Sequence, residues 1–301
     1  MRRLAGLARA GGAAVSLHAL DLPGCRPDVL AHYLKALAIF RLVSEQADAD
    51  ARCLWRDGTF VLVSSLDKPG LERFLAEKYK PTPVVAPWNG GSGFYPKGSD
   101  DALQAIRAGA SDRFAEYRVV IQASLAMTSG QTESPKDEAK QALVARLRAE
   151  WPEAAVRWLD AALALSDERV EYPALLGTGG NDGHFDFTNN FMQRLVELID
   201  PSTGAPTSRS RALLHSSLFA SPATGLLSGA AIGQFLPGGA GGANASSGYD
   251  GDSLLNPWDF VLALEGAVAF QVAAVRRLDT RGLMQGTRSR GSTRFARCDL
   301  C

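Results

Sequence analysis

Three segments rich in glycine and asparagine divide the chain, and they limit its fold more than any other feature of the sequence. The first loop covers residues 87–97, the second loop covers 177–190 and the third loop covers 233–256. They hold much of the excess in a total of 30 glycines among 301 residues. Glycine weakens helices and strands, so regular structure is expected between these loops. An apolar share of 46% is enough for a substantial core there.

Between the loops the apolar periodicity is mostly helical. Leu30, Tyr33, Leu34 and Leu37 recur at helical spacing, and that helix should end near Gln46. Further helices are expected over 68–79, 99–109, 111–128, 135–150, 153–166, 191–200, 208–220 and 256–278.

Local signals mark the ends of some of these elements. Ser134 is a plausible N-cap for the helix that starts near 135, and Asn256, followed by proline, is a second one. Asp57-Gly58 lies between two β-prone runs, which predicts a hairpin, and residues 170–176 have the composition of a strand. We therefore expect a helix-dominated α+β fold with a small antiparallel sheet or hairpin near the N-terminus.

The two ends of the chain differ from its middle. Residues 276–301 contain seven Arg against two Asp, and residues 1–16 contain three Arg and no acidic residue. We expect a dispensable leader over 1–16, a folded region over 17–278 and a disordered or non-native Arg/Ser-rich tail over 279–301. Because the whole chain has no net charge, the body between its ends is acidic. An acidic body binds phosphates poorly alone, but it could form one wall of a larger nucleic-acid-binding assembly.

The sequence predicts neither a membrane span nor a zinc site. The longest apolar run, Phe260 to Val275, has 16 residues and contains Glu265 and Gln271. A membrane-spanning helix needs about 20 apolar residues. The C-x-x-C at the C-terminal end has no second ligand pair, and the simplest compartment is the cytoplasm.

The second loop offers the most tempting catalytic set. Asp182, His184 and Asp186 alternate, so on an extended segment they would share one face and could hold a metal ion for hydrolysis. Three ligands within five residues are a weak signature, and such side chains more often hydrogen-bond a tight loop. A metal-dependent hydrolase is therefore the alternative hypothesis, and we expect no enzyme activity, metal or cofactor.

Recognition by backbone and amide groups fits the three loops better. Glycine lets a ligand approach the main chain, amide side chains can pair with base edges, aromatic rings can stack on unpaired bases, and cations can contact phosphates. The candidate residues for nucleic-acid binding are Trp88, Asn89, Tyr95, Lys97, Asn181, Asn189, Asn190, Arg194, Gln234 and Asn244. The alternative is that Asn and Gly take the positive-φ positions of tight turns and that the aromatic residues belong to the core.

Long motifs in and around these loops resemble one particular family. They are Leu22-Pro-Gly-Cys-Arg-Pro27, Pro83-Val-Val-Ala-Pro-Trp-Asn-Gly-Gly-Ser-Gly-Phe-Tyr-Pro96, Gly177-Thr-Gly-Gly-Asn-Asp-Gly183, Thr188-Asn-Asn-Phe-Met-Gln-Arg-Leu195 and Asn256-Pro-Trp-Asp-Phe-Val-Leu-Ala-Leu-Glu-Gly266. Together, in order from about Leu17 to Leu278, they resemble the Csx-type large subunit of type I-G (formerly I-U) CRISPR–Cas effector complexes.

The resemblance implies a non-catalytic subunit of an RNA-guided surveillance complex. Such a subunit would act in antiviral defence with CRISPR RNA, target DNA and other effector-complex subunits, helping to recognise the motif that flanks the target. A separate helicase–nuclease, recruited to the complex, would cut the DNA. Members of the family continue beyond the position of Leu278, so a truncated or frameshifted copy is expected here. A degenerate fragment without function is a further hypothesis.

Overall fold

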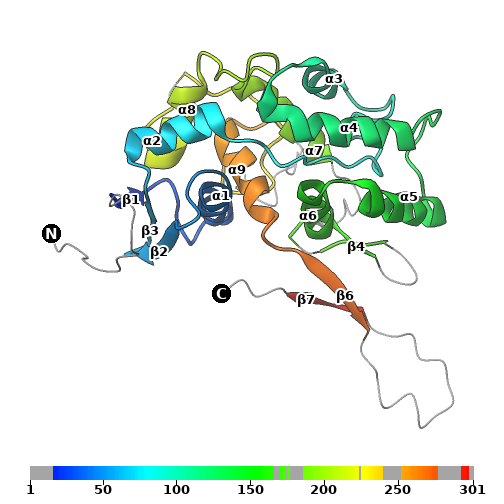
Figure 1. Ribbon diagram of the computed structural model, residues 1–301, viewed down its shortest axis with the longest axis horizontal. Coiled ribbons are helices and arrows are strands. Elements are labelled where there is room, and N and C mark those ends of the chain that lie inside the picture. Colours follow the sequence, from blue (N-terminus) through cyan, green and yellow to red (C-terminus); the bar gives the residue numbers. More distant parts are fainter. Residues whose placement is uncertain are drawn as a thin grey trace, which may run out of the picture.

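Helices predominate in the computed structural model, which describes residues 16–165, 170–173, 175–176, 186–223, 225–239, 252–276 and 293–297. A three-stranded antiparallel sheet lies near the N-terminus, which confirms the predicted α+β class. Figure 1 shows α1 (Leu30–Gln46) and α9 (Pro257–Ala267) in the middle of the molecule, with the sheet to one side and several helices to the other. The core is therefore built around two helices from opposite ends of the chain.

The sheet consists of β1 (His18–Leu22), β2 (Arg52–Arg56) and β3 (Thr59–Ser64), in the order β1-β3-β2. The predicted hairpin is confirmed. Its turn residues Asp57 and Gly58 have φ angles of 50° and 75°, the left-handed values that a two-residue hairpin of this type requires. β3 is the central strand because it pairs with β2 across this turn and with β1 on its other edge.

α1 and α9 touch at the closest helix contact in the described core. A Cβ atom built on Gly266 would lie 1.9 Å from the backbone oxygen of Leu34, so only glycine allows this approach. The predicted start of α9 is confirmed, since the Asn256 side chain accepts a hydrogen bond from the backbone N–H of Trp258. The motif that ends in Glu265-Gly266 is therefore a packing surface against α1.

The predicted end of this last helix is wrong. α9 stops at Ala267, and residues of the expected continuation form β6 (Val272–Arg276), which pairs in antiparallel register with β7 (Thr293–Arg297). Pairing with a strand further along the chain overrides the local apolar pattern, which cannot reveal such a partner. β7 lies within the segment expected to be a disordered or non-native tail. The rest of that tail, and residues 1–15 of the expected leader, lie outside the described residues.

The helix expected over 68–79 changes type along its length. α2 (Lys68–Arg73) is an α-helix, and η1 (Phe74–Lys78) continues it as a π-helix, a rare and wide turn. The last carbonyls of a helix have no partner within it. The buried guanidinium of Arg113 donates to the backbone oxygens of Leu75, Ala76 and Tyr79 at this end, and also to that of Gly204. A side chain distant in sequence thus provides donors for the end of this helix.

The other helices agree with the expected ranges, with differences at their ends. They are α3 (Asp101–Ala108), α4 (Ala115–Met127), α5 (Asp137–Glu150), α6 (Glu153–Ala162), α7 (Asp186–Leu198) and α8 (Ser210–Phe219), with a short 3-10 turn η2 (Asp112–Phe114) before α4. α7 begins before the expected position 191. The predicted cap Ser134 is wrong, because α5 begins only after Lys136. Ser134 instead packs against the first loop, 3.4 Å from where a Cβ atom on Gly90 would lie.

Two further expectations hold only in part. The strand expected over 170–176 is limited to β5 (Val170–Glu171), which pairs with β4 (Ala164–Leu165). β4 also ends the expected helix 153–166 early. Across the part of the chain that the structure describes, no helix has the length and apolarity needed to cross a bilayer.

Candidate nucleic-acid interface

The first loop is anchored in the core by its aromatic residues. Trp88 has no exposed surface and its ring lies 6.3 Å from that of Trp151, centroid to centroid. Tyr95 is also buried; its hydroxyl donates to the backbone oxygen of Pro87 at 2.7 Å, and burial raises the pKa of Tyr95 to about 12. In this arrangement both rings pack in the core, which agrees with the alternative role, and base stacking by Trp88 and Tyr95 stays a prediction.

Two adjacent residues at the start of α7 tie the loops together. The Nδ2 of Asn189 donates to the backbone oxygen of Ser99 at 2.8 Å and, more weakly, to that of Gly91 at 3.4 Å. The Nδ2 of Asn190 donates to the backbone oxygen of Ala231, just before the third loop, at 2.7 Å. The end of the second loop therefore bonds to the first loop and to the residues just after it on one side, and to the segment that leads into the third loop on the other.

The predicted amide side chains use their N–H donors for bonds within the protein, whereas some of their oxygen acceptors have no partner among the described residues. The buried Oδ1 of Asn189 and Oε1 of Gln234 have no hydrogen-bond partner among the described residues. Gln234 Nε2 makes only a long contact, 3.4 Å, to Ala231 O. Asn89 is buried, and its Oδ1 accepts from the N–H of Gly91 at 3.4 Å. Direct pairing of these amides with base edges would require the loops to open.

The cations behave differently from the amides. Lys97 is exposed at the end of the first loop, and its Cδ would lie 3.9 Å from a Cβ atom on Gly90, so its stem crosses that glycine. Arg194 is 16% exposed and pairs with Glu197 at 3.1 Å. Lys97 is therefore the predicted cation best placed to meet a phosphate, whereas the Arg194 charge is already engaged within α7.

Glycine at one position of the first loop is required by the backbone. Gly93 has a φ of 86°, and a Cβ atom there would lie 3.2 Å from the backbone oxygen of Ser99 and 3.7 Å from Asn189 Oδ1. The alternative role of glycine in tight turns is thus observed here, and the same residue allows the loop to approach α7 closely.

Several candidate residues fall outside the described part of the chain. They are two candidate amides, Asn181 and Asn244, and two candidate metal ligands, Asp182 and His184. The side chain of the third candidate ligand, Asp186, is not described either. Among the residues that the structure does describe, no group of three or more His, Cys, Asp or Glu side chains is placed to hold a metal ion. The hydrolase hypothesis stays a prediction.

A buried charge network lies next to the loops, and the sequence search did not single it out. Glu265, fully buried on α9, accepts hydrogen bonds from Arg41 Nη2, Tyr79 Oη, and both the backbone N–H and the Oγ1 of Thr82, the last two at 2.8 and 2.6 Å. Burial, and secondly the Glu265 charge, raise the pKa of Tyr79 well above its ordinary value. An acidic residue inside the longest apolar run was the signal that could have revealed this network.

A second buried pair joins the same two helices. Lys35 on α1 is 1% exposed; its Nζ donates to Asp259 Oδ1 at 2.6 Å and to the backbone oxygen of Ser217 at 2.7 Å. The thiol of Cys25 lies in this environment, and burial raises its pKa to about 12. A thiol with such a pKa is protonated at neutral pH and is a poor nucleophile.

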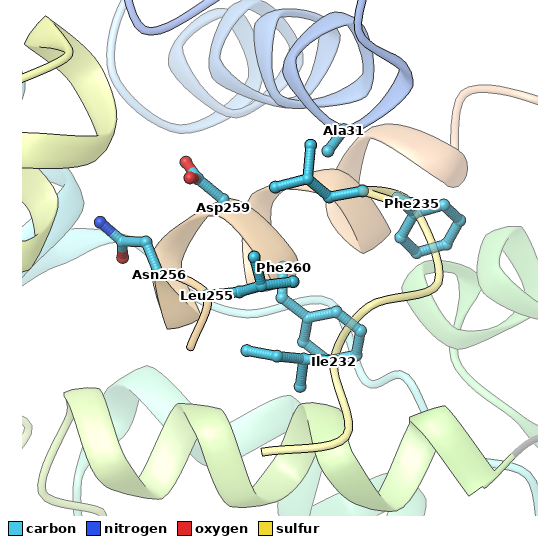
Figure 2. A pocket seen from close by; sticks show the side chains of 8 residues that line it. Ala31, Ile232, Phe235, Leu255, Asn256, Asp259 and Phe260 are labelled. Atoms are coloured by element: carbon cyan, nitrogen blue, oxygen red, sulfur yellow. The ribbon is translucent and has the colours of Figure 1, made fainter. Parts of the chain in front are cut away.

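A small cavity lies where the third loop begins, against the N-terminal turns of α1 and α9. Its volume is about 10 Å³, close to the least that one water molecule requires. Figure 2 shows the polar ends of Asn256 and Asp259 directed away from Phe235, and both side chains are engaged with other partners. This cavity is a packing gap at the loop and offers no room for a cofactor.

Comparison with known proteins gives no assignment. No protein-family model matches the chain, and no curated protein matches it. The function is therefore argued from the sequence motifs and from the geometry of the loops.

Proposed function

We propose that the chain is a non-catalytic, nucleic-acid-binding subunit of an RNA-guided CRISPR effector complex of type I-G, acting in the cytoplasm. It would bind CRISPR RNA and target DNA jointly with sister subunits, help to recognise the flanking motif, and leave cleavage to a recruited helicase–nuclease. The motif resemblance supports this type of complex, and the arrangement of the loops supports the binding surface.

The single observation that carries the binding role is the meeting of the loops at α7. Asn189 and Asn190 hold segments from distant parts of the sequence against one helix start, and the partly exposed Gly90 and Gly91 with exposed Lys97 face outward beside them. A glycine backbone with a neighbouring lysine suits the phosphodiester chain, because the ligand can approach the main chain closely and its charge is neutralised.

One experiment tests this surface directly. Binding of fluorescent single-stranded RNA and DNA by the 301-residue chain is measured by anisotropy across a range of salt concentrations. We expect weak, salt-sensitive binding in which Lys97→Ala lowers affinity and reduces the slope of log K against log salt by about 0.7, the value for one phosphate contact to a single strand. Lys78→Ala, at an exposed lysine on η1, is the matched control. If Lys97→Ala and Lys78→Ala bind with the same affinity and the same salt dependence, the first loop is not part of the interface.

A second experiment tests the assembly. The chain is co-expressed with the backbone subunits of a type I-G effector and a CRISPR RNA, and is purified through a tag on the chain itself. We expect guide RNA and backbone subunits to co-purify. Purified chain that carries neither would contradict the proposed function.

A further inference from the structure

A polar cavity of about 220 Å³ is lined by residues of α1, α4 and α6, by the segment 80–82 and by Val268, the residue after α9. It is far larger than the ~15 Å³ that one water molecule requires, so a small polyatomic anion with bound water fits. Three cations line it, Arg41, Lys80 and Arg157, against two acidic residues, Glu45 and Glu116. The described candidate surface at the first loop includes none of these side chains.

The cations come from three separate elements, and each is held in place. Arg41 on α1 is anchored by Glu265 and by Thr82 Oγ1 at 3.2 Å. Arg157 on α6 pairs with Glu45 at 2.9 Å and with Glu153 at 3.4 Å. The backbone N–H and C=O of Lys80 are both bound by the side chain of Gln46, at 2.9 and 3.0 Å, which holds the backbone of Lys80 at the rim. No partner for its ammonium group is found among the described residues. Arginine side chains that are already held lose less entropy when an anion binds.

Glu45 shows how an anion can sit between the two arginines. Its Oε2 lies 3.0 Å from Arg41 Nη1 and its Oε1 lies 2.9 Å from Arg157 Nη1. The two guanidinium groups therefore already flank a two-oxygen anion. Glu45 is 36% exposed, and an ion pair this open to solvent contributes little to stability. Rotation of Glu45 into solvent would leave three cations at the cavity and Glu116 as the one acid in its lining, while Glu265 and Glu153 would still pair with Arg41 and Arg157 from outside that lining.

We propose that this cavity is a phosphate-binding site, with Arg41, Arg157 and Lys80 as its ligands and Glu45 as the internal carboxylate that phosphate displaces. Guanidinium forks match the oxygen geometry of phosphate, and a lysine adds a compact charge at the rim. The phosphate could be free or part of a polynucleotide. Phosphate binding itself does not depend on the proposed function, whereas its extension to a polynucleotide rests on that function.

Inorganic phosphate is the probe, and isothermal titration calorimetry on the 301-residue chain is the measurement, with chloride at equal ionic strength as the reference. We expect Lys80→Ala to weaken phosphate binding about tenfold, because a hydrogen bond to a charged group is lost. Glu45→Gln should strengthen binding, because it removes the competing charge and leaves the arginines in place. Arg146→Ala, an exposed arginine on α5 outside the cavity, is the control.

Opposite signs for the two cavity variants are the decisive result, since general loss of structure would weaken binding in both. No phosphate binding by either the native chain or Glu45→Gln would overturn the inference, as would equal losses in Lys80→Ala and Arg146→Ala. The source is identified by repeating the oligonucleotide titration with Lys80→Ala: a loss of affinity indicates a strand phosphate, and an unchanged affinity indicates free phosphate. If Lys97→Ala does not change nucleic-acid binding, the proposed first-loop surface is contradicted, but phosphate binding in the cavity is not.

Discussion

The α1–α9 contact differs from the loop cluster at α7, where Asn189 and Asn190 bond to neighbouring segments. The difference is in how many hydrogen bonds their buried polar groups make. In the helix contact, the buried charges are densely bonded: Glu265 accepts from four donors, and Lys35 reaches both Asp259 and Ser217. In the loop cluster, the acceptors of Asn189 and Gln234 have no partner among the described residues. A buried carboxylate with several donors fixes a structure, even though the nearby Arg41 Nε has no partner among the described residues, whereas spare buried acceptors leave capacity for rearrangement or for a ligand. The helix contact is therefore the scaffold, and the loops are the adaptable part.

The largest expected effect comes from removing the central acid of the scaffold. Glu265→Ala leaves Arg41, Tyr79 and Thr82 without their shared acceptor, and breaking a buried ion pair costs about 3–5 kcal/mol in the free energy of unfolding. Urea unfolding measures the change. Glu45→Ala is the control, because Glu45 also pairs with Arg41 but is partly exposed, and its loss should cost less than ~1 kcal/mol. Similar costs for the two variants would show that the buried network is not the scaffold.

The close approach of the two helices predicts the next effect. Gly266→Ala places a methyl group 1.9 Å from the backbone oxygen of Leu34, so α1 and α9 must move apart. Overpacking of this kind costs about 1–3 kcal/mol. Gly238→Ala is the matched control, because a Cβ atom there meets nothing within 4 Å. Thermal unfolding of the two variants checks the difference, and an undisturbed Gly266→Ala protein would contradict this helix contact.

Loop variants should cost less. Asn190→Ala removes the bond to the Ala231 carbonyl, and the loss of one such hydrogen bond costs ~1 kcal/mol. Gln131→Ala, at an exposed position, should stay within about 0.5 kcal/mol of the native protein. Urea unfolding gives the stability, and the anisotropy titration shows whether loosening the third loop also changes nucleic-acid binding. A cost for Asn190→Ala equal to that of Glu265→Ala would place the loops in the scaffold.

The smallest effect concerns pH. The pKa of His32, at the start of α1, is lowered first by burial and second by the charge of Lys35. The Nδ1 atom of His32 has no partner among the described residues. As the pH falls below the ordinary histidine pKa of about 6.5, the unfolded chain takes up the proton first, so the folded state loses stability in acid. The partial exposure of His32 keeps this loss small, because solvent screens its charge. His32→Gln should show a smaller loss between pH 7 and pH 5 in urea unfolding. An unchanged pH dependence would exclude His32 as the cause.

Local signals predicted the elements better than their ends or their contacts. The Asp57-Gly58 turn and the Asn256 cap were readable because each depends on a few neighbouring residues. The switch from α9 to β6 was not, because it depends on pairing with Thr293–Arg297. In the candidate site, Asn189 and Asn190 were identified, but their partners are backbone oxygens, which leave no mark in the residue types. Trp88 and Tyr95 were candidates for base stacking with core packing as the alternative, and only the structure shows that both are buried.

Composition and spacing alone determined the fold class and the positions of the three glycine-rich segments, because these follow from periodicity and residue type along the chain. Only the tertiary structure decided that Glu265 is a buried acceptor, that the loops meet at α7, and that Arg41, Lys80 and Arg157 surround one cavity. The physical reason is that these features join residues far apart in sequence, and only the packed core brings them within bonding distance.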